Sequence, residues 1–519
     1  MKNKCVDVLI IGAGPTGLMM ALEALRYGLT CRIIDKGTSY QDQSRAVAIQ
    51  AQTLEIFGHV GLAESFLKAG LRVKAANPIS SFRRLARVSF DILDSPYPFI
   101  LSLEQAKTEK ILEDHLSSMG VKVERGVELL KLHQGEGGVE ALVTGETLHA
   151  TWVVGCDGAH SQVRKELNLS FEGKAFSDIF SLADVRIQWD YPHDEFFVFL
   201  NAEGLMAAIP LPEPSRYRLI FQLERCRDLL KKNRSLPSGE LREEMVAKPN
   251  IAEIQELLCK YAGSHVRVSD PSWCANFYIN SRMVETYRKG SVFLAGDAAH
   301  IHSPVGGQGM NTGLQDAFNL AWKLALVHKK QAGKELLDTY DLERRAVGKK
   351  LLKATERASQ MATLRNSVAI ALRNVALSCL MRMTFFRKFF VKMISQTGIR
   401  YPGGVFRAPN ASLMDQDKPT DLYTLWSKST SFHLLIFTGR EMPDLTSIFE
   451  QIAHHPIIPI VIFQGDKLPL LPEGVRSCRD PRGSAHRIYG VKGSRVVLIR
   501  PDLYIGYQAD NIRGDHAFI

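Results

Sequence analysis

Three glycines and one carboxylate near the start of the chain have the spacing of a nucleotide-binding turn. In VDVLIIGAGPTGLMM, Gly12, Gly14 and Gly17 form G-x-G-x-x-G directly after an apolar run. The first glycine permits a tight turn, the second lets backbone approach a pyrophosphate, and the third lets helix and strand pack closely. Asp35 follows at the distance expected of a carboxylate that binds a ribose diol. These residues predict an adenine dinucleotide site, although Asp35 alone does not separate NAD from FAD.

A second glycine-rich segment, GDAAHIHSPVGGQGMNTG, contains a second set of candidate residues. An apolar run leads into Gly296-Asp297, and Gly306, Gly307 and Gly309 precede a predicted helix. The N-terminus of a helix presents unpaired N–H groups and partial positive charge, and glycines let backbone approach a flat ring. This segment is therefore predicted to hold an anionic ligand.

Two histidines lie within the second segment, at His300 and His302. They have no third ligand at the spacing of a metal site, so no metal is predicted. A catalytic role is not favoured for either, and no catalytic residue is identified from the sequence.

The elements that must position these residues begin with a strand, a helix and a strand. The apolar run 6–11 predicts a strand buried on both faces of a parallel sheet. A helix over 15–27 and a second strand over 30–34 are expected next.

Three more segments carry polar groups suited to a nucleotide, each weak by itself. Arg45 follows Asp35 by ten residues, and an arginine there suits a pyrophosphate. Gln105 stands at the start of a predicted helix, where an amide could reach a polyol. The acid–glycine turn Asp157-Gly158 follows a predicted strand.

Together these segments resemble one family, the single-component flavoprotein aromatic hydroxylases, of which p-hydroxybenzoate hydroxylase and phenol hydroxylase are members. The likeness runs through nearly the whole chain, and its anchors occur in the family's order and spacing. Gln52 and Ser291 stand where the family often has arginine, but neither lies in the glycine loop of the second segment. The anchors are G-x-G-x-x-G at 12–17, the Asp157-Gly158 turn with Ser161 and Arg164, and Gly296-Asp297.

The resemblance implies an FAD enzyme that takes electrons from NADPH or NADH. It implies that O2 reacts at the flavin and that a flavin C4a-hydroperoxide hydroxylates an aromatic substrate, phenolic or polyketide-like. It places Asp297 on the ribityl chain of FAD, gives Asp157 a part in holding flavin and nicotinamide nucleotide, and makes His300 a loop anchor. The residues that it assigns to cofactor binding are Gly12, Gly14, Pro15, Thr16, Gly17, Asp35, Lys36, Arg45, Gln105, Asp157, Gly296, Asp297, Pro304, Gly307, Gly309, Met310 and Asn311.

The fold class that follows is α/β. A Rossmann-like FAD-binding domain is expected over 1–170 and, with a helical region, over 281–400. An antiparallel sheet over 171–280 is predicted to form the inserted substrate domain. The resemblance implies a thioredoxin-like domain over 410–519, without the C-x-x-C of a redox-active thioredoxin. Within the sheet, Met206, Ile209, Pro210 and Phe221 are candidate cavity walls.

Composition adds weaker constraints. The chain has 519 residues, too many for one core, and a net charge of +10 that fits anionic cofactors, nucleic acid or membrane equally well. Its eight scattered cysteines indicate a reducing cytoplasm, and neither a signal peptide nor a transmembrane segment is predicted. The resemblance implies no nucleic-acid partner and leaves a homodimer open.

The segment 377–396 is basic and amphipathic. From 357 to 414 the chain has no Asp or Glu and nine Lys or Arg residues. Packing of this segment against the domains or a subunit is favoured over contact with an anionic membrane. Two alternatives to the aromatic hydroxylase remain: a flavin epoxidase or hydroxylase of a lipid-like substrate at a membrane, and a non-catalytic flavin-binding protein.

Overall fold

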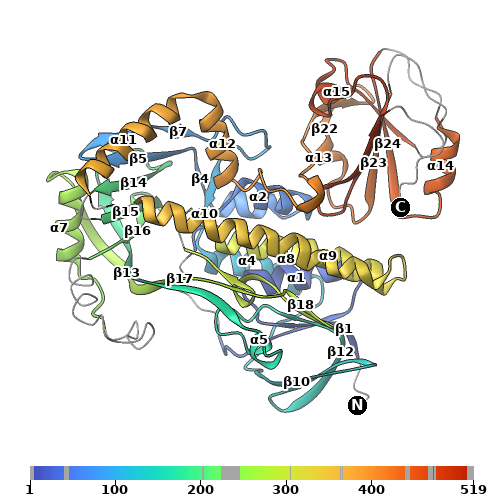
Figure 1. Cartoon of the computed structure of the whole chain (residues 1–519), viewed down its shortest axis with the longest axis horizontal. Coiled ribbons are helices and arrows are strands. Elements are labelled where there is room, and N and C mark those ends of the chain that lie inside the picture. The colour runs from blue at the N-terminus through green and yellow to red at the C-terminus, as the bar shows by residue number, and fades with distance from the viewer. Residues whose placement is uncertain are drawn as a thin grey trace. The chain divides into compact units, whose positions relative to one another are not determined.

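The computed structural model describes residues 5–39, 46–201, 204–223, 246–303, 306–362, 364, 366–438, 445–465, 471–472 and 475–510, without the side chains of 174–178 and 278–279. The chain forms two compact units (Figure 1). Unit 1 contains residues 1–54, 65–93 and 97–396, and unit 2 contains 55–64, 94–96 and 397–519.

The predicted N-terminal strands lie in a largely parallel sheet of unit 1, in which their carboxyl ends meet at one edge. Strand β1 (Val6–Ile11) pairs in parallel with β2 (Cys31–Asp35) and β12 (Glu146–Gly155), and β12 pairs in parallel with β19 (Val292–Leu294). Both predicted N-terminal strands are confirmed, and helix α1 (Pro15–Arg26) connects them as expected. The carboxyl ends of parallel strands are where α/β sheets bind their ligands.

A second, mainly antiparallel sheet holds nine strands. Its principal strands are β13 (Phe171–Gln188), β14 (Glu195–Asn201), β15 (Gly204–Pro210), β16 (Arg216–Phe221) and β17 (Arg267–Val284). Strand β5 (Ala75–Ser80) joins it in parallel beside β14. This addition from early in the chain was not predicted, because sequence separation hides which edge strand completes a sheet.

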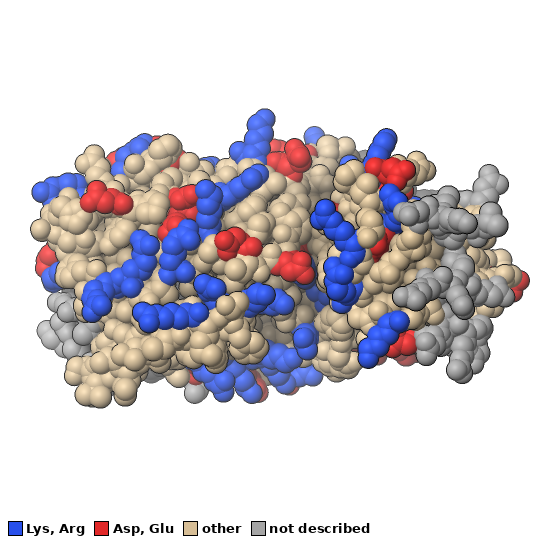
Figure 2. All heavy atoms as spheres, turned by 90° about the horizontal axis from the view of Figure 1, so that it is seen from above, with Lys and Arg blue, Asp and Glu red and all other residues tan. Residues whose placement is uncertain are grey.

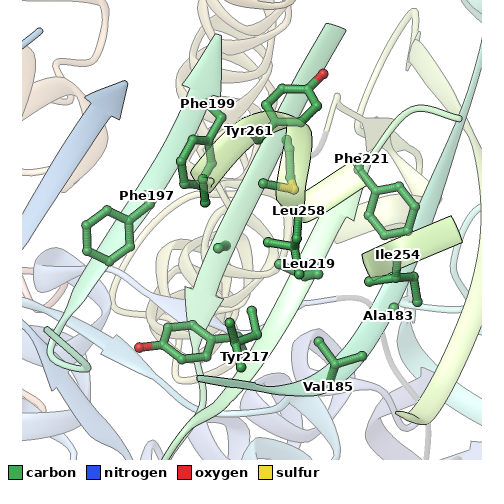
Figure 3. Close-up of a cluster of buried hydrophobic side chains, with 14 of the residues drawn as sticks. Ala183, Val185, Phe197, Phe199, Tyr217, Leu219, Phe221, Ile254, Leu258 and Tyr261 are labelled. Atoms are coloured by element: carbon green, nitrogen blue, oxygen red, sulfur yellow. The ribbon is translucent and has the colours of Figure 1, made fainter. Parts of the chain in front are cut away.

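One face of this sheet is closed by helix α7 (Ile251–Ala262), whose amphipathic sequence and capping box at Asn250 and Glu253 define its start. Figure 3 shows side chains of the strands and of α7 meeting in one apolar cluster. Phe197, Phe199 and Phe221 are fully buried there. The opposite face of the sheet is therefore the one left for a ligand.

Two basic helices follow α10 (Ala346–Ala362): α11 (Ser367–Arg382) and α12 (Thr384–Ile394). Packing of their aromatic residues was expected, but Phe385 is 74% exposed and Phe389 is 62% exposed. These two side chains do not pack within this chain, because only one side of α12 meets the protein, and packing against a second subunit stays a prediction. Figure 2 views the molecule from the side where α11 and α12 lie in Figure 1, and shows many Lys and Arg side chains among uncharged surface.

Among the described residues, no single helix is long and apolar enough to cross a membrane. Only α11 and α12 taken together have such a length and composition, and they are bent by 100° at their junction.

Unit 2 contains a seven-stranded mixed sheet. Its interior strand β23 (Phe432–Phe437) pairs in parallel with β24 (Ile457–Phe463) and antiparallel with β26 (Arg495–Ile499), which pairs antiparallel with β27 (Ile505–Asp510). The apolar sequences FHLLIF, IIPIVIF and RVVLI of the C-terminal region thus form neighbouring strands of this sheet.

Candidate active site

A cavity of about 980 Å³ in unit 1 connects the glycine-rich turns with the open face of the antiparallel sheet. Gly14 lines it from the first turn, and Asp297, Gly307 and Gly309 line it from the second. Phe180 and other apolar side chains of the sheet line the remainder. Both glycine motifs therefore open onto one continuous space.

The first turn is shaped by the absence of side chains at its glycines. Gly12 has φ of +102°, and a Cβ there would lie 2.4 Å from the carbonyl oxygen of Cys156. A Cβ on Gly17 would lie 1.9 Å from the carbonyl oxygen of Gly12. Gly14 differs, because a Cβ there would meet nothing within 4 Å and would point into open space. The first and third glycines are thus required by the fold, and the second leaves room for a ligand.

Asp35 ends β2 beside this turn. Its Oδ2 accepts the N–H of Ala13 at 2.7 Å, and its Oδ1 accepts the N–H of Gly37 at 2.7 Å. A carboxylate oxygen has more than one lone pair, so each oxygen can still accept a hydroxyl.

The second turn packs directly on the first. Gly296 has φ of +60°, and a Cβ there would lie 2.6 Å from Thr16 Oγ1. Gly313, in helix α8 (Gly309–His328), approaches the same oxygen, since its Cβ would lie 2.3 Å away. Thr16 therefore holds the starts of α1 and α8 together, which explains why two motifs almost 300 residues apart line one cavity.

The geometry fits a dinucleotide cofactor such as FAD. A Cβ on Gly309, like one on Gly14, would meet no protein atom within 4 Å, so both glycines leave ligand space. Each lies at the start of a helix, where free N–H groups favour phosphate or an electron-rich ring.

The predicted site residues divide into three groups. Arg45 and Pro304 lie outside the described residues. Seven line no part of the cavity: Gly12, Gly17, Asp35, Lys36, Asp157, Gly296 and Asn311. The residues that line it are Gly14, Pro15, Thr16, Gln105, Asp297, Gly307, Gly309 and Met310.

Asn311 and Asp157 hold segments in place through their side chains. Asn311 donates to the carbonyl oxygens of Ala48 and Gly307 at 2.8 and 2.9 Å, and accepts the N–H of Gln50 at 2.8 Å. Asp157 accepts the Ser161 hydroxyl at 2.5 Å and two backbone N–H groups at the start of α5 (Gln162–Glu166). Neither residue lines the cavity, and both side chains bond to neighbouring segments of the chain.

The apolar wall follows the pleat of the sheet. On β15, Leu205, Ala207 and Ile209 line the cavity, whereas Met206 lies in the cluster against α7. Successive side chains of a strand point to opposite faces. Of the four candidate wall residues only Ile209 is correct: Met206 and Phe221 face α7, and Pro210 does not line the cavity.

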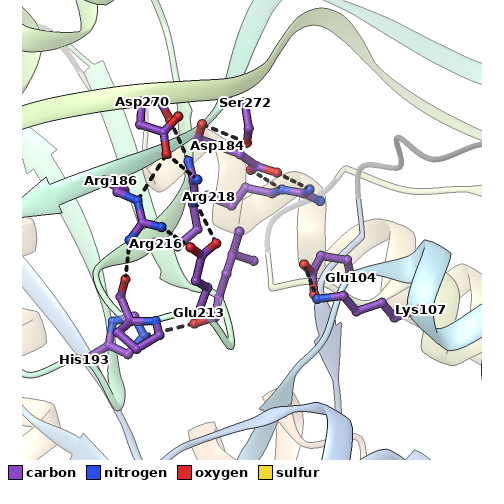
Figure 4. A network of polar contacts seen from close by, with 12 residues as sticks. Glu104, Lys107, Asp184, Arg186, His193, Glu213, Arg216, Arg218, Asp270 and Ser272 are labelled. Carbon is purple, nitrogen blue, oxygen red and sulfur yellow. Dashed lines mark hydrogen bonds and ion pairs between the residues drawn. The ribbon is translucent and has the colours of Figure 1, made fainter.

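A buried ion pair supports one aromatic wall residue. Arg218 donates to both oxygens of Asp184, at 2.8 and 2.7 Å (Figure 4). The Arg218 guanidinium also lies over the ring of Trp273, 4.8 Å from its centroid, and Trp273 lines the cavity. Since the pair is bidentate and buried, it fixes the orientation of this ring.

The two histidines form part of a buried chain that the sequence did not reveal. His300 Nδ1 lies 2.8 Å from His302 Nε2, and His300 Nε2 lies 2.7 Å from Asp316 Oδ2. Arg344 Nε donates to Asp316 Oδ1 at 2.7 Å. Among the described residues no three His, Cys, Asp or Glu side chains are grouped to hold a metal. Asp316 shares its side of helix α8 with Thr312 and Asn319, so the sequence did not distinguish it from an exposed polar residue.

Comparison with known proteins identifies the family of this site. A family model described as FAD binding domain matches residues 5–355. Pentachlorophenol 4-monooxygenase of Sphingobium chlorophenolicum is 36% identical over 360 residues, which are 67% of this chain and 63% of that protein. The matched part thus spans less than two thirds of that relative.

Two further relatives match along nearly their whole length. The 12-dehydrotetracycline 5-monooxygenase/anhydrotetracycline 6-monooxygenase of Streptomyces rimosus subsp. rimosus is 31% identical over 97% of this chain and 95% of its own. The solved structure of anhydrotetracycline hydroxylase from Streptomyces rimosus has a TM-score of 0.74 and 29% identity, covering 98% of this chain and 96% of that one. The chain therefore belongs to the FAD-binding family of the flavoprotein aromatic hydroxylases, as the resemblance of its motifs predicted.

Proposed function

We propose that the protein is an FAD-dependent monooxygenase that uses NADPH or NADH and O2 to hydroxylate an aromatic substrate. The observation that carries this proposal is the shared cavity, lined by Gly14, Asp297 and Gly309 at one part and by the apolar sheet at another. A site for an elongated nucleotide and a site for an apolar ring thus adjoin without a wall between them.

FAD, when bound, would supply the redox and oxygen-transfer chemistry that no side chain provides. We assign its pyrophosphate to the turn from Gly12 to Gly17, its adenosine ribose to Asp35 and its ribityl chain to Asp297. Gly307, Gly309 and the first N–H groups of α8 would then face the flavin ring. Asn311 and Asp157 act through the loops that they hold, and Arg45, Pro304 and Lys36 remain proposed contacts from the family resemblance.

The apolar wall favours a substrate with fused rings. Phe180 and Phe277 stack at 6.0 Å between centroids, and Trp273 stands on the same strand as Phe277. Two of the relatives that match over nearly full length are named as enzymes of tetracycline compounds, which are polycyclic. We therefore propose a phenolic, polyketide-like substrate. Because the reaction consumes NAD(P)H, we place it in the cytoplasm.

We propose that residues 1–170 and 281–400 form the cofactor domain, 171–280 the substrate domain, and 410–519 a thioredoxin-like domain with a structural role. Cys478 is the only cysteine after residue 400, and burial raises the pKa of its thiol to about 11. Such a thiol is a poor nucleophile at neutral pH, which supports a structural role.

The deciding experiment combines flavin content with turnover. Purified protein should carry flavin absorbance, and a panel of monocyclic phenols and polycyclic polyketides should include compounds that stimulate NAD(P)H oxidation and gain one oxygen atom. Protein that retains no flavin after reconstitution with FAD contradicts the cofactor assignment. Flavin-loaded protein that hydroxylates no compound in the panel supports instead a non-catalytic flavin-binding protein.

One observation favours a second candidate, the same oxidation of a lipid-like substrate at a membrane. Phe385 and Phe389 of α12 are exposed, and Arg387, Lys388 and Lys392 lie on the same helix. Exposed aromatics combined with basic residues are typical of helices that lie in an anionic membrane surface.

Co-sedimentation with vesicles tests this candidate. Binding to phosphatidylserine-containing vesicles, but not to phosphatidylcholine vesicles, should fall at least tenfold in a Phe385→Ser/Phe389→Ser variant. A Leu130→Ser/Leu142→Ser variant is the matched control, because Leu130 on β10 (Leu129–Gly135) and Leu142 on β11 (Gly138–Val143) are 49% and 44% exposed on the sheet that contains β1. Equal sedimentation with both vesicle types excludes the candidate. Self-association of the protein without vesicles, if the same variant abolishes it, would indicate that the exposed side of α12 contacts a second copy of the chain.

A further inference from the structure

We propose that His302 accepts the proton of the substrate's hydroxyl group, and that His300 and Asp316 position it and receive the charge. This inference rests on the proposed hydroxylase function and names the base that the sequence did not identify. It begins from the place of His302, which lines the cavity between the glycine loop and the apolar wall.

The hydrogen-bond partners determine which nitrogen of each ring carries a proton. Asp316 accepts from Arg344 Nε and from the N–H of Gly296, at 2.7 and 3.0 Å, so it is a carboxylate and accepts only. His300 Nε2 must therefore donate to Asp316 Oδ2. In a neutral ring Nδ1 of His300 is then an acceptor, and His302 Nε2 must donate to it.

With the protons placed in this way, one acceptor atom in the hydrogen-bonded series His302–His300–Asp316 is left without a donor, namely Nδ1 of His302. That nitrogen is buried and has no hydrogen-bond partner within the described structure. A buried polar atom without a partner is unfavourable, so it is expected to be paired when the cavity is filled. A substrate hydroxyl is the partner of matching chemistry.

The proton transfer is balanced within these groups. The substrate O–H bond breaks and its proton binds Nδ1 of His302, while the electron pair stays on the substrate oxygen. The proton on His302 Nε2 then moves to His300 Nδ1, which makes His300 an imidazolium that donates to Asp316. The substrate becomes an anion whose ring is more electron-rich and more readily hydroxylated, and no other reactant is needed.

Asp316 can balance this charge, because its Oδ2 lies 2.7 Å from His300 Nε2. Burial, and secondarily His300, hold the pKa of His302 well below its usual range, so His302 is neutral and does not retain the proton. Burial would raise the pKa of Asp316, but Arg344 and His300 lower it below the usual value, so Asp316 stays ionised beside His300. Tyr287 stacks on the His300 ring at 5.6 Å and is the other titratable group packed against it.

The first test measures ionisation without turnover. Flavin-loaded protein is mixed with 4-nitrophenol, whose phenolate absorbs visible light, at a pH below the pKa of the free probe. Wild-type protein should produce the phenolate band, and His302→Gln should reduce it at least tenfold at equal flavin content. Wild-type protein that produces no phenolate band overturns the proposal, whether or not the protein hydroxylates any compound.

The second test separates a chemical role from a structural one. With a phenol that is un-ionised at the assay pH, His302→Gln should lower kcat on the order of 10²- to 10⁴-fold, and with a strongly acidic, fully ionised phenol it should change kcat little. Asp316→Asn should show the same pattern if it retains flavin. Equal losses with both phenols in His302→Gln would show that His302 only maintains the fold.

Discussion

At the scale of single residues, the glycines of one turn have different tasks although they share one motif. Gly12 has a positive φ and no room for a Cβ, so its substitution acts on folding. Gly14 has an extended φ of −72°, and a Cβ on it would enter the cavity. Substitution of Gly14 therefore acts on the ligand.

We expect Gly14→Ala to weaken FAD binding at least tenfold, about 1.4 kcal/mol, because the new methyl group occupies the space of the ligand. Its thermal stability without FAD should equal that of wild type. Flavin fluorescence titration of the apoprotein measures the affinity.

Gly135→Ala is the matched control, since Gly135 also has open space around its Cβ and no positive φ, but lies on β10 (Leu129–Gly135) away from the cavity. This variant should bind FAD as wild type does. An unchanged FAD affinity in Gly14→Ala would contradict the assignment of the FAD pyrophosphate to this turn.

At the scale of elements, the positions of the apolar strands were predicted correctly. Which face of a strand meets the cavity was not predicted. The runs that became β1, β2, β23 and β24 are apolar enough to be buried whatever their orientation. In β15 the residues on both faces are apolar, so alternation carries no signal for which face meets the cavity. The neighbouring element decides this, because α7 closes one face of the sheet.

The same reason explains why the sequence did not show which aromatic residues of α12 pack within the chain. An apolar and basic helix has the same sequence pattern whether its aromatic side packs inside or stays exposed. Phe390 packs partly against a buried cluster, whereas Phe385 and Phe389 remain outside. Only the three-dimensional path of the chain separates them.

At the scale of the whole molecule, a buried histidine should make the stability of unit 2 sensitive to acid. His433 lies on the interior strand β23 of unit 2, and burial lowers its pKa from 6.5 to about 4. The unfolded state therefore binds the proton more tightly. The contribution of His433 to the free energy of unfolding is therefore fully present above about pH 6.5. It is lost as the pH falls toward 4, by roughly 3 kcal/mol in total.

Calorimetry of the full chain at neutral and mildly acidic pH measures this loss. We expect the transition of unit 2 to move to lower temperature at acidic pH in wild type, and to move clearly less in His433→Leu, which keeps an apolar side chain in the strand. An equal acid shift in both proteins would show that His433 is not the responsible group.

The sequence by itself determined the chemistry of this protein. Glycines at fixed offsets, strand ends and a carboxylate are local features, and their spacing is sufficient to indicate a nucleotide turn at 12–17 and a second ligand segment near 297. The order of these anchors then indicated the family, which the comparisons confirmed.

Only the tertiary structure decided how those features act together. Thr16 against Gly296 brings the two motifs into one cavity, and the pairing of His302 with His300 and Asp316 depends on where α8 lies. Such contacts join residues through space, and a single sequence has no periodic signal for them. The nucleotide turn could therefore be predicted, whereas the cavity wall and the proton acceptor required the fold.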